Sequence, residues 1–374
     1  MRRSQLRDTM LGFGLSIILV SGRCDRAIEC QQVGSIAGHK VLRTFSGTDN
    51  GGAALSLAVS AALFEDRGGT YWAGVPLGVY SYDENMDRWK PALSSSGKHI
   101  APSTRAICQS GDGKLWFHSA LFHSLTAYQN GQWESVDRLG AFSTQPSAVL
   151  LTASSGRVWI AQQRGLFCYD NDHWNNPVGI PDNVRMQPSP HRRGPPVSST
   201  PLPKVRTTPE IAVGIEGHDG TLWMGTQTAI LAFKPPTREW LAYPLPEGFV
   251  GVFIIHEDSS GRIWFADTEG HVSAYDRSRD TWSMTYDVMK HIPGSGLLSS
   301  SPQFAITAIC QDKAGVMIFG SFLGLIRLEE ARDQWSIFTV ENSALPDDSI
   351  TSIMRDGRGR IWLGTGKGLV LLRE

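Results

Sequence analysis

The sequence predicts an all-β protein, a seven-bladed β-propeller made of four-stranded blades. Three observations support this fold: a tryptophan-centred motif returns about every 43 residues, glycine-containing turns flank each copy, and apolar residues stand on both sides of the central tryptophan. The chain has 12 tryptophans and 39 glycines in 374 residues. A repeat of this length, made of short strands and tight turns, is typical of one propeller blade.

Seven copies of the motif align on their central residue. These central residues are Trp72, Trp116, Trp159, Trp223, Trp264, Ile318 and Trp362. Each copy reads as an apolar strand, a turn such as the Asp-x-x-Gly of 258–261, the tryptophan strand, a second glycine turn, a third strand and a short fourth strand. The fourth strand carries a second tryptophan, such as Trp282. Tight hairpin turns need positive φ angles, which glycine adopts without steric cost.

The tryptophan strand is apolar on both faces, as in Ile263-Trp264-Phe265. Because side chains alternate faces along a strand, both faces of this strand must be buried. A blade that lies between two neighbours meets this condition. We therefore expect each central tryptophan to pack between adjacent blades, where burial of the ring contributes about 2–3 kcal/mol.

The last copy supplies three strands before Glu374, and a fourth strand is predicted near the N-terminus. Residues 39–45 resemble the fourth-strand sequence at residues 334–339, with Leu42 in the tryptophan position and Phe45 matching Phe338. We expect residues 41–45 to pair beside Gly368–Leu372 and to close the ring. Closure removes exposed sheet edges, which otherwise favour aggregation.

Two copies carry a recognisable consensus. Residues 356–369 read Asp-Gly-Arg-Gly-Arg-Ile-Trp-Leu-Gly-Thr-Gly-Lys-Gly-Leu, and residues 220–226 read Gly-Thr-Leu-Trp-Met-Gly-Thr. The text resembles the two-component regulator propeller repeat, and the resemblance covers nearly all of residues 41–374. It implies a propeller that serves as the extracytoplasmic sensor half of a membrane-bound histidine kinase or regulator. The sequence shows no kinase or DNA-binding part, which departs from that plan.

A looser similarity is to streptogramin-lyase-like propellers, through Trp116-Phe117 and Trp264-Phe265. No motif carries catalytic residues over from those enzymes. The similarity leaves open an enzyme, a lyase or hydrolase with polar residues converging at the central channel.

Residues 1–22 are predicted to be a signal peptide, because Arg2, Arg3 and Arg7 precede an apolar stretch at 10–20 and small residues follow it. The alternative is a disordered leader. Residues 23–40 are expected to form a linker, and residues 41–374 the propeller. The protein is therefore expected outside the cytoplasm, in the periplasm or secreted. A lipid anchor at Cys24 stays open, although Arg23 is a poor match to such a signal.

The net charge, the length of the apolar runs and the absence of known motifs argue against several classes of function. The formal net charge is −1, whereas nucleic-acid-binding proteins commonly carry an excess of positive charge. No apolar run reaches the roughly 18 residues of a membrane span. No metal-ligand or cofactor motif is visible, and we expect no cofactor, metal or catalytic residue, and a monomer. His256 is the best candidate for a polar channel residue, and Cys108, Cys168 and Cys310 are expected to be small buried side chains.

Two spacings exceed the repeat and indicate insertions at 177–209, which is proline-rich and basic, and at 287–302. Both follow the fourth strand of a blade, so they and the loops between second and third strands should emerge on one face. Loops on a rigid scaffold commonly carry binding residues. The candidate ligand-binding residues are His118, Gln162, Gln163, Arg164, Asp267, Glu269, Lys367, Arg192 and Arg193.

These observations favour a non-catalytic, extracytoplasmic propeller that binds or senses a ligand or protein on the face bearing the insertions. The basic insertion fits an acidic ligand or partner, or else it is a flexible solvated loop. The propeller enzyme is the alternative, and a purely structural scaffold is a third possibility.

Overall fold

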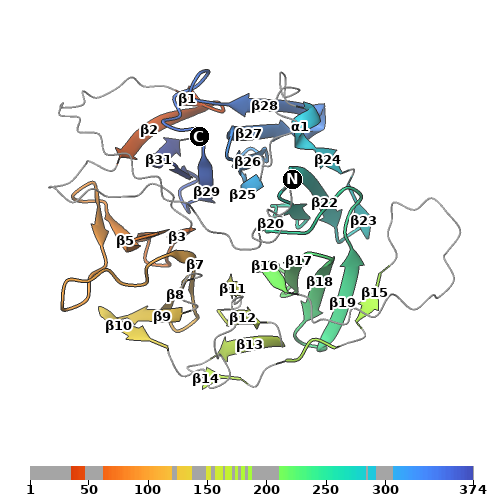
Figure 1. Cartoon of the computed structure of the whole chain (residues 1–374), viewed down its shortest axis with the longest axis horizontal. Helices are drawn as coiled ribbons and strands as arrows, with labels where there is room; N and C mark the ends of the chain where they lie inside the picture. Colours follow the sequence, from red (N-terminus) through yellow and green to blue (C-terminus); the bar gives the residue numbers. More distant parts are fainter. Residues whose placement is uncertain are drawn as a thin grey trace, which may run out of the picture. The chain divides into compact units, whose positions relative to one another are not determined.

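The computed structural model describes residues 35–46, 62–119, 124–136, 149–152, 156–162, 165–170, 173–175, 178–181, 184–187, 210–283, 285–291 and 306–373. These residues belong to the second of two compact units, residues 34–374. The described segments form seven small sheets, in which consecutive strands lie side by side. The predicted seven-bladed propeller is confirmed, and each sheet is one blade (Figure 1).

Blades 1 to 4 follow one another along the chain. Blade 1 contains β3 (Ala62–Glu65), β4 (Tyr71–Val75), β5 (Gly78–Asp83) and β6 (Arg88–Pro91). Blade 2 contains β7 (Thr104–Gln109), β8 (Leu115–Ser119), β9 (Ser124–Gln129) and β10 (Gln132–Ser135). Blade 3 contains β11 (Val149–Thr152), β12 (Val158–Gln162), β13 (Gly165–Asp170) and β14 (His173–Trp174). Blade 4 contains β16 (Ile211–Glu216), β17 (Leu222–Thr226), β18 (Ala229–Lys234) and β19 (Glu239–Pro244), with β15 (Arg185–Met186) at its edge.

Blades 5 to 7 complete the ring. Blade 5 contains β20 (Ile254–Glu257), β21 (Ile263–Ala266), β22 (His271–Asp276) and β23 (Thr281–Trp282), with β24 (Tyr286–Asp287) also on β22. The helix α1 (Val288–His291) and the 3-10 turn η2 (Glu330–Arg332) are the helical segments among the described residues. Blade 6 contains β25 (Ile306–Gln311), β26 (Met317–Ser321), β27 (Gly324–Glu329) and β28 (Gln334–Phe338). Blade 7 contains β29 (Ile350–Arg355), β30 (Ile361–Thr365), β31 (Gly368–Arg373), β2 (His39–Ser46) and β1 (Ser35–Ile36).

The first strand of every blade is innermost. Neighbouring first strands contact one another around the whole ring, in the order β3, β7, β11, β16, β20, β25, β29 and back to β3 (Figure 1). The second strands are buried along their length in six of the blades, as the apolar sequence on both of their faces predicts. The core therefore consists of the contacts between blades.

The central tryptophans pack between blades, as predicted. Trp264 of blade 5 lies 6.1 Å, centroid to centroid, from Phe319 of blade 6. Trp116 of blade 2 lies 4.6 Å from Tyr169 of blade 3, edge to face. Aromatic pairs in this geometry add to the free energy gained from burial of the rings alone. Each tryptophan thus belongs to one blade and is buried against the next.

A glycine two residues after the tryptophan has a different role from the turn glycines. A Cβ atom on Gly225 would lie only 2.5 Å from Cγ1 of Val252, which precedes the first strand of the next blade. The equivalent distance from Gly320 to Cγ2 of Ile350 is 2.8 Å. In the Trp-x-Gly motif the glycine therefore allows the neighbouring blade to approach closely.

The ring closes as predicted, through β2 and β31. Their register runs from Lys40 opposite Arg373 to Ser46 opposite Gly368. β1 folds back on β2, and β1 lies within the segment expected to be a linker. Phe45 is buried and stacks on Trp362, with centroids 5.9 Å apart and rings inclined by 15°.

The assignment of Leu42 to the tryptophan position was wrong by one residue. Fourth-strand tryptophans such as Trp89 and Trp335 lie opposite the fifth residue of the third strand. In blade 7 that residue is Leu372, and its partner is Val41. A β-bulge between Val41 and Arg43 shifts the register, and Leu42 is 40% exposed. A bulge adds one residue to one strand only, so alignment of the text alone places the slot incorrectly.

Candidate functional site

The propeller presents two sets of connections, because antiparallel strands turn alternately at opposite ends. The loop face carries the connections from second to third strands and from each fourth strand to the next blade. The turn face carries the connections from first to second and from third to fourth strands. The predicted binding residues belong to the loop face.

Two of the predicted residues are buried rather than available on that face. His118 is 7% exposed and lies in β8, two residues after Trp116, at the position that Gly225 holds in blade 4. It therefore occupies the contact between blades instead of the rim. Asp267 is 0% exposed. His118 is the second residue after its central tryptophan, and Asp267 is the third residue after its own. Side chains at both positions are buried in this fold.

The Asp267 carboxylate holds its own loop in shape. Its Oδ1 accepts hydrogen bonds from the backbone N–H groups of Glu269, at 2.9 Å, and His271, at 2.8 Å. Its Oδ2 lies 2.8 Å from Nδ1 of the His271 ring. The equivalent loop in blade 7 uses Thr365, whose hydroxyl accepts from Lys367 N–H and donates to the Gly368 carbonyl. Asp267 is thus the blade 5 form of a loop cap.

The loop cap occupies a position that repeats from blade to blade, so the aligned sequence copies indicate it. The third residue after the central position is a hydroxyl-bearing residue in four other copies. These residues are Ser119, Thr226, Ser321 and Thr365. In three of them the hydroxyl donates to a carbonyl in the same loop. Short polar side chains at such positions satisfy backbone groups that the turn leaves unpaired.

Glu269 and Lys367 are exposed on the loop face, as predicted. The Lys367 ammonium lies 3.8 Å from the Asp347 carboxylate. Gln162 is the last residue of β12, and its side chain is outside the described part. Gln163, Arg164, Arg192 and Arg193 also lie outside the described residues. Binding by any of these residues stays a prediction.

The loop face also exposes apolar side chains, which the sequence did not single out. Seven large hydrophobic residues are exposed among the described residues, and five of them belong to this face. Those five are Leu77, Leu93, Val250, Phe322 and Val340. Each is between 43% and 50% exposed. Leu77 and Phe322 lie on connections within blades 1 and 6. Leu93, Val250 and Val340 lie on the connections from blade 1 to 2, from blade 4 to 5 and from blade 6 to 7.

Both predicted insertions begin at the outer edge of a blade. In the first, Val178 bridges Leu166 of blade 3, and β15 then pairs in parallel with β19 of blade 4. In the second, α1 follows β24, and the His291 ring stacks on Trp335 of blade 6 at 5.4 Å. Residues 188–209 and 292–302 lie outside the described part. The predicted position of the insertions beside the channel mouth therefore stays a prediction.

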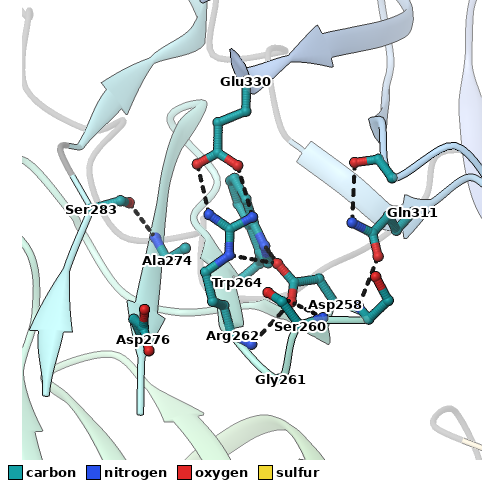
Figure 2. Close-up of polar contacts among 12 residues, drawn as sticks. Asp258, Ser260, Gly261, Arg262, Trp264, Ala274, Asp276, Ser283, Gln311 and Glu330 are labelled. Atoms are coloured by element: carbon teal, nitrogen blue, oxygen red, sulfur yellow. Dashed lines mark hydrogen bonds and ion pairs between the residues drawn. The ribbon is translucent and has the colours of Figure 1, made fainter. Parts of the chain in front are cut away.

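The turn face is built around the Asp-x-x-Gly turns, and Figure 2 shows the one in blade 5. Asp258 accepts hydrogen bonds from the N–H groups of Ser260 and Arg262 and, at 2.8 Å, from the indole N–H of Trp264. The turn ends with Gly261 at φ 82°, the left-handed region that glycine favours. Burial raises the pKa of Asp258, but hydrogen bonds from Ser260 and Trp264 outweigh it and leave the pKa below its usual range.

Arg262 extends this turn to the next blade. Its guanidinium donates a hydrogen bond to the Asp258 carboxylate at 2.8 Å. It also forms a two-pronged ion pair with Glu330 of blade 6, at 2.8 and 2.7 Å (Figure 2). Arg360 of blade 7 is equivalent and reaches Tyr71 of blade 1 at 2.7 Å. Paired charges with this planar geometry are among the stronger polar contacts in proteins. The polar groups of this network are therefore occupied in holding blades together.

A second set of contacts joins neighbouring turns. The last residue of a first strand accepts a backbone N–H from the turn of the preceding blade, and four seams have this bond. The pairs are Gln109 with Arg67, Glu257 with His218, Gln311 with Ser259 and Glu65 with Gly357. The sequence shows this repeat as a Glu or Gln seven residues before the tryptophan.

His256 does not form a cluster with Glu257 around a cavity. Glu257 faces a different histidine, with His218 Nδ1 at 2.8 Å, and also pairs with Arg277. Burial lowers the pKa of His256 to about 4; Asp258 opposes this shift and Arg355 adds to it. His256 is therefore neutral near pH 7. Among the described residues no group of three or more His, Cys, Asp or Glu side chains is placed to hold a metal ion.

The three cysteines of the propeller are buried, as predicted, and none of the three forms a disulfide. Burial raises the pKa of the Cys168 and Cys310 thiols to about 11, and raises that of Cys108 further. A thiol with a raised pKa is a poor nucleophile at neutral pH. In the described segments, no helix is both long enough and apolar enough to span a membrane.

The chain is similar to known propellers. Residues 344–367 match the family model of the two-component regulator propeller, which confirms the resemblance found in the sequence. The extracellular domain of the putative one component system BT4673 from B. thetaiotaomicron has a TM-score of 0.62 at 15% identity, over 89% of this chain. That of the putative hybrid two component system BT3049 from B. thetaiotaomicron has a TM-score of 0.59 at 17% identity, over 90% of this chain.

This chain spans 40% of the length of the first of these structures and 41% of the second. Virginiamycin B lyase from Staphylococcus aureus is also similar, with a TM-score of 0.61 at 12% identity, over 88% of this chain and 97% of the lyase. At these identities the likeness establishes the fold. No curated protein is a significant match in sequence. The chain is a seven-bladed β-propeller that carries the two-component regulator propeller repeat.

Proposed function

We propose that the protein is a non-catalytic sensing propeller that binds a ligand or protein partner on its loop face. The observation that carries the proposal is the set of exposed apolar side chains, of which the described residues place five out of seven on that face. Exposed apolar groups gain about 25 cal/mol for each Å² that a partner removes from water. Because all five lie on the same face of the ring, they favour an interaction surface there.

The polar residues of the same face would orient such a partner. Glu269 and Lys367 are exposed on the same face as the apolar side chains, whereas Asp267 keeps its loop fixed from within. A rigid loop loses little conformational entropy on binding, which improves affinity. The network on the turn face, by contrast, uses its charges within the protein.

We also propose that the protein works outside the cytoplasm. The basic and then apolar text of residues 1–22 supports export. The similar structures are extracellular domains of the putative one component system BT4673 and the putative hybrid two component system BT3049, which agrees with this location. Export would be tested by fractionating cells that produce the full chain, and recovery in the cytoplasm alone would contradict it.

The binding proposal is tested with a triple variant, Val250→Ser, Phe322→Ser and Val340→Ser. Met86→Ser is the matched control, because Met86 is 58% exposed and lies on the turn face. Cross-linking in extracts of the source organism, followed by mass spectrometry, should recover the same partner with wild type and control but not with the triple variant. A partner retained equally by all three proteins would place the binding surface elsewhere.

A second candidate, a propeller enzyme, has one specific observation in its favour. The Asp267 carboxylate holds Nδ1 of His271, a residue of which part is exposed, in the manner of an oriented general base. The similar lyase has been solved with quinupristin. We expect no turnover of quinupristin by this protein. Turnover that disappears in a folded His271→Ala variant would favour the enzyme instead.

A further inference from the structure

A depression lies on the turn face of blade 7. Its volume is about 400 Å³, and it is lined by Leu42, Lys313, Arg358, Gly359, Arg360 and Arg373. Four of these six residues are cations and none is a carboxylate. The volume lies in the range of sites for small organic ligands.

Two of the four cations are held by carboxylates. Arg358 forms a two-pronged ion pair with Glu84 of blade 1, at 2.8 and 3.2 Å, and this contact raises the pKa of its guanidinium. Arg360 is held by Asp356 at 2.7 Å. Arg373 is exposed, and no carboxylate of the described part lies within ion-pair distance of it. Lys313, exposed on the turn of blade 6, faces this group across the seam.

The repeat changes at this seam, between blades 6 and 7. Four other seams use a Glu or Gln oxygen to accept a backbone N–H of the neighbouring turn. At this seam the equivalent residue is Arg355, whose guanidinium donates hydrogen bonds but cannot accept them. The central tryptophan of blade 6 is also replaced, by Ile318. Arg355, which is not part of the lining, therefore adds a positive charge at the seam between blades 6 and 7.

Closure of the ring supplies the rest of the lining. Leu42 is the residue displaced by the β-bulge in β2, and Arg373 lies on β31 opposite Lys40. The bulge therefore brings an apolar side chain to the edge of a cationic depression. Guanidinium groups match the geometry of phosphate, sulfate and carboxylate oxygens, and an adjacent apolar group contacts the carbon part of an organic anion.

We propose that this depression binds a small organic anion through an oxyanion group, with the exposed Arg373 as its principal contact. Lys313, Arg358 and Arg360 form the cationic wall, and Leu42 contacts the apolar part of the ligand. The site lies on the face opposite the proposed loop-face surface. It is therefore independent of that surface.

The test uses calorimetric titration of the full chain with inorganic phosphate, inorganic sulfate and citrate. Arg373→Ala should weaken binding of the best probe about five- to tenfold, and the double variant Lys313→Ala with Arg373→Ala should weaken it further. Arg279→Ala is the matched control, because Arg279 is exposed on the turn face of blade 5. It should leave the dissociation constant unchanged. Thermal unfolding verifies that each variant is folded.

The three probes distinguish the kind of anion. Tighter binding of phosphate or sulfate than of citrate indicates a phosphorylated or sulfated ligand, and the reverse order indicates a carboxylate. Leu42→Ser should weaken citrate more than inorganic phosphate. Failure of all three probes to bind would overturn the proposal. Binding that is the same in wild type and in the double variant would overturn it as well.

Discussion

The hydrogen bond between an indole and the turn aspartate is present only where the sequence supplies an acceptor six residues before the tryptophan. Asp66, Asp258 and Asp356 provide one, at 2.9, 2.8 and 3.1 Å. Gly217 stands at this position before Trp223, and the Trp223 indole N–H is buried without a partner. The copies of one repeat therefore have unequal polar contributions to stability.

This difference gives a matched pair of substitutions. Trp264→Phe removes the indole N–H and leaves the buried Asp258 carboxylate with one donor fewer, whereas Trp223→Phe removes an N–H that has no partner. We expect Trp264→Phe to lower the free energy of unfolding by about 1–2 kcal/mol more than Trp223→Phe. Urea denaturation of both variants measures the difference. Equal losses would mean that the hydrogen bond contributes nothing net.

The lowered pKa of His256 predicts a pH dependence of stability. Its pKa falls from an ordinary value of 6.5 to about 4 in the folded protein, so the unfolded chain binds more protons between these values. The free energy of unfolding is therefore unaffected by protonation of His256 above about pH 7, and it decreases as the pH falls from there toward 4. At pH 5 we expect a loss of about 1–2 kcal/mol relative to pH 8.

The His256→Gln variant isolates this contribution, because glutamine does not titrate. The stability difference between wild type and variant, from urea denaturation, should shrink by that amount when the pH is lowered from 8 to 5. Asp258 and Arg355, the charged groups that influence His256, are present in both proteins. Parallel pH profiles would show that His256 is protonated equally in the folded and unfolded chains.

Among the strands, the sequence located nearly every element, because each blade has to bury the same apolar pattern. It could not place Leu42, because a β-bulge shifts the pairing register of β2 with β31 and leaves no mark in the sequence. It also could not show that β15, within the first insertion, pairs in parallel with β19, a strand about 55 residues away in the chain. The expectation that His118 and Asp267 are exposed was wrong, because the repeat puts both positions inside the propeller.

The corrected register at the closure predicts different roles for two residues of β2. Phe45 is surrounded by Trp362, Tyr82 and Trp89, with ring centroids 5.4 to 6.4 Å away. Phe45→Ala should lower the free energy of unfolding by about 3–4 kcal/mol through the cavity that it leaves. Leu42→Ala, on the exposed bulge, should change it by less than about 0.5 kcal/mol. Comparable losses at both positions would contradict the register.

Closure makes the seven blades one cooperative unit. In an open array of repeats each unit contacts only its neighbours, and parts of the array can unfold separately. Here Glu65 of blade 1 accepts the Gly357 N–H of blade 7 at 2.6 Å, across 292 residues of sequence. The β2 and β31 pairing adds a second link between distant parts of the chain. Stability of one blade therefore depends on all the others.

Removal of the closing strand tests this dependence. A chain that begins after Ser46 lacks β1 and β2, so β31 is left as an exposed edge and Trp362 loses its stacking partner Phe45. We expect the single thermal transition of the full chain, followed by tryptophan fluorescence, to shift down by at least about 10 °C and to broaden. Exposed strand edges also pair between chains, so size-exclusion chromatography should show larger species. A chain that begins at Gly34 keeps both strands and serves as the control, with one sharp transition and an unchanged elution volume. If the shorter chain unfolds as sharply and at the same temperature as this control, the closing strand does not couple the blades.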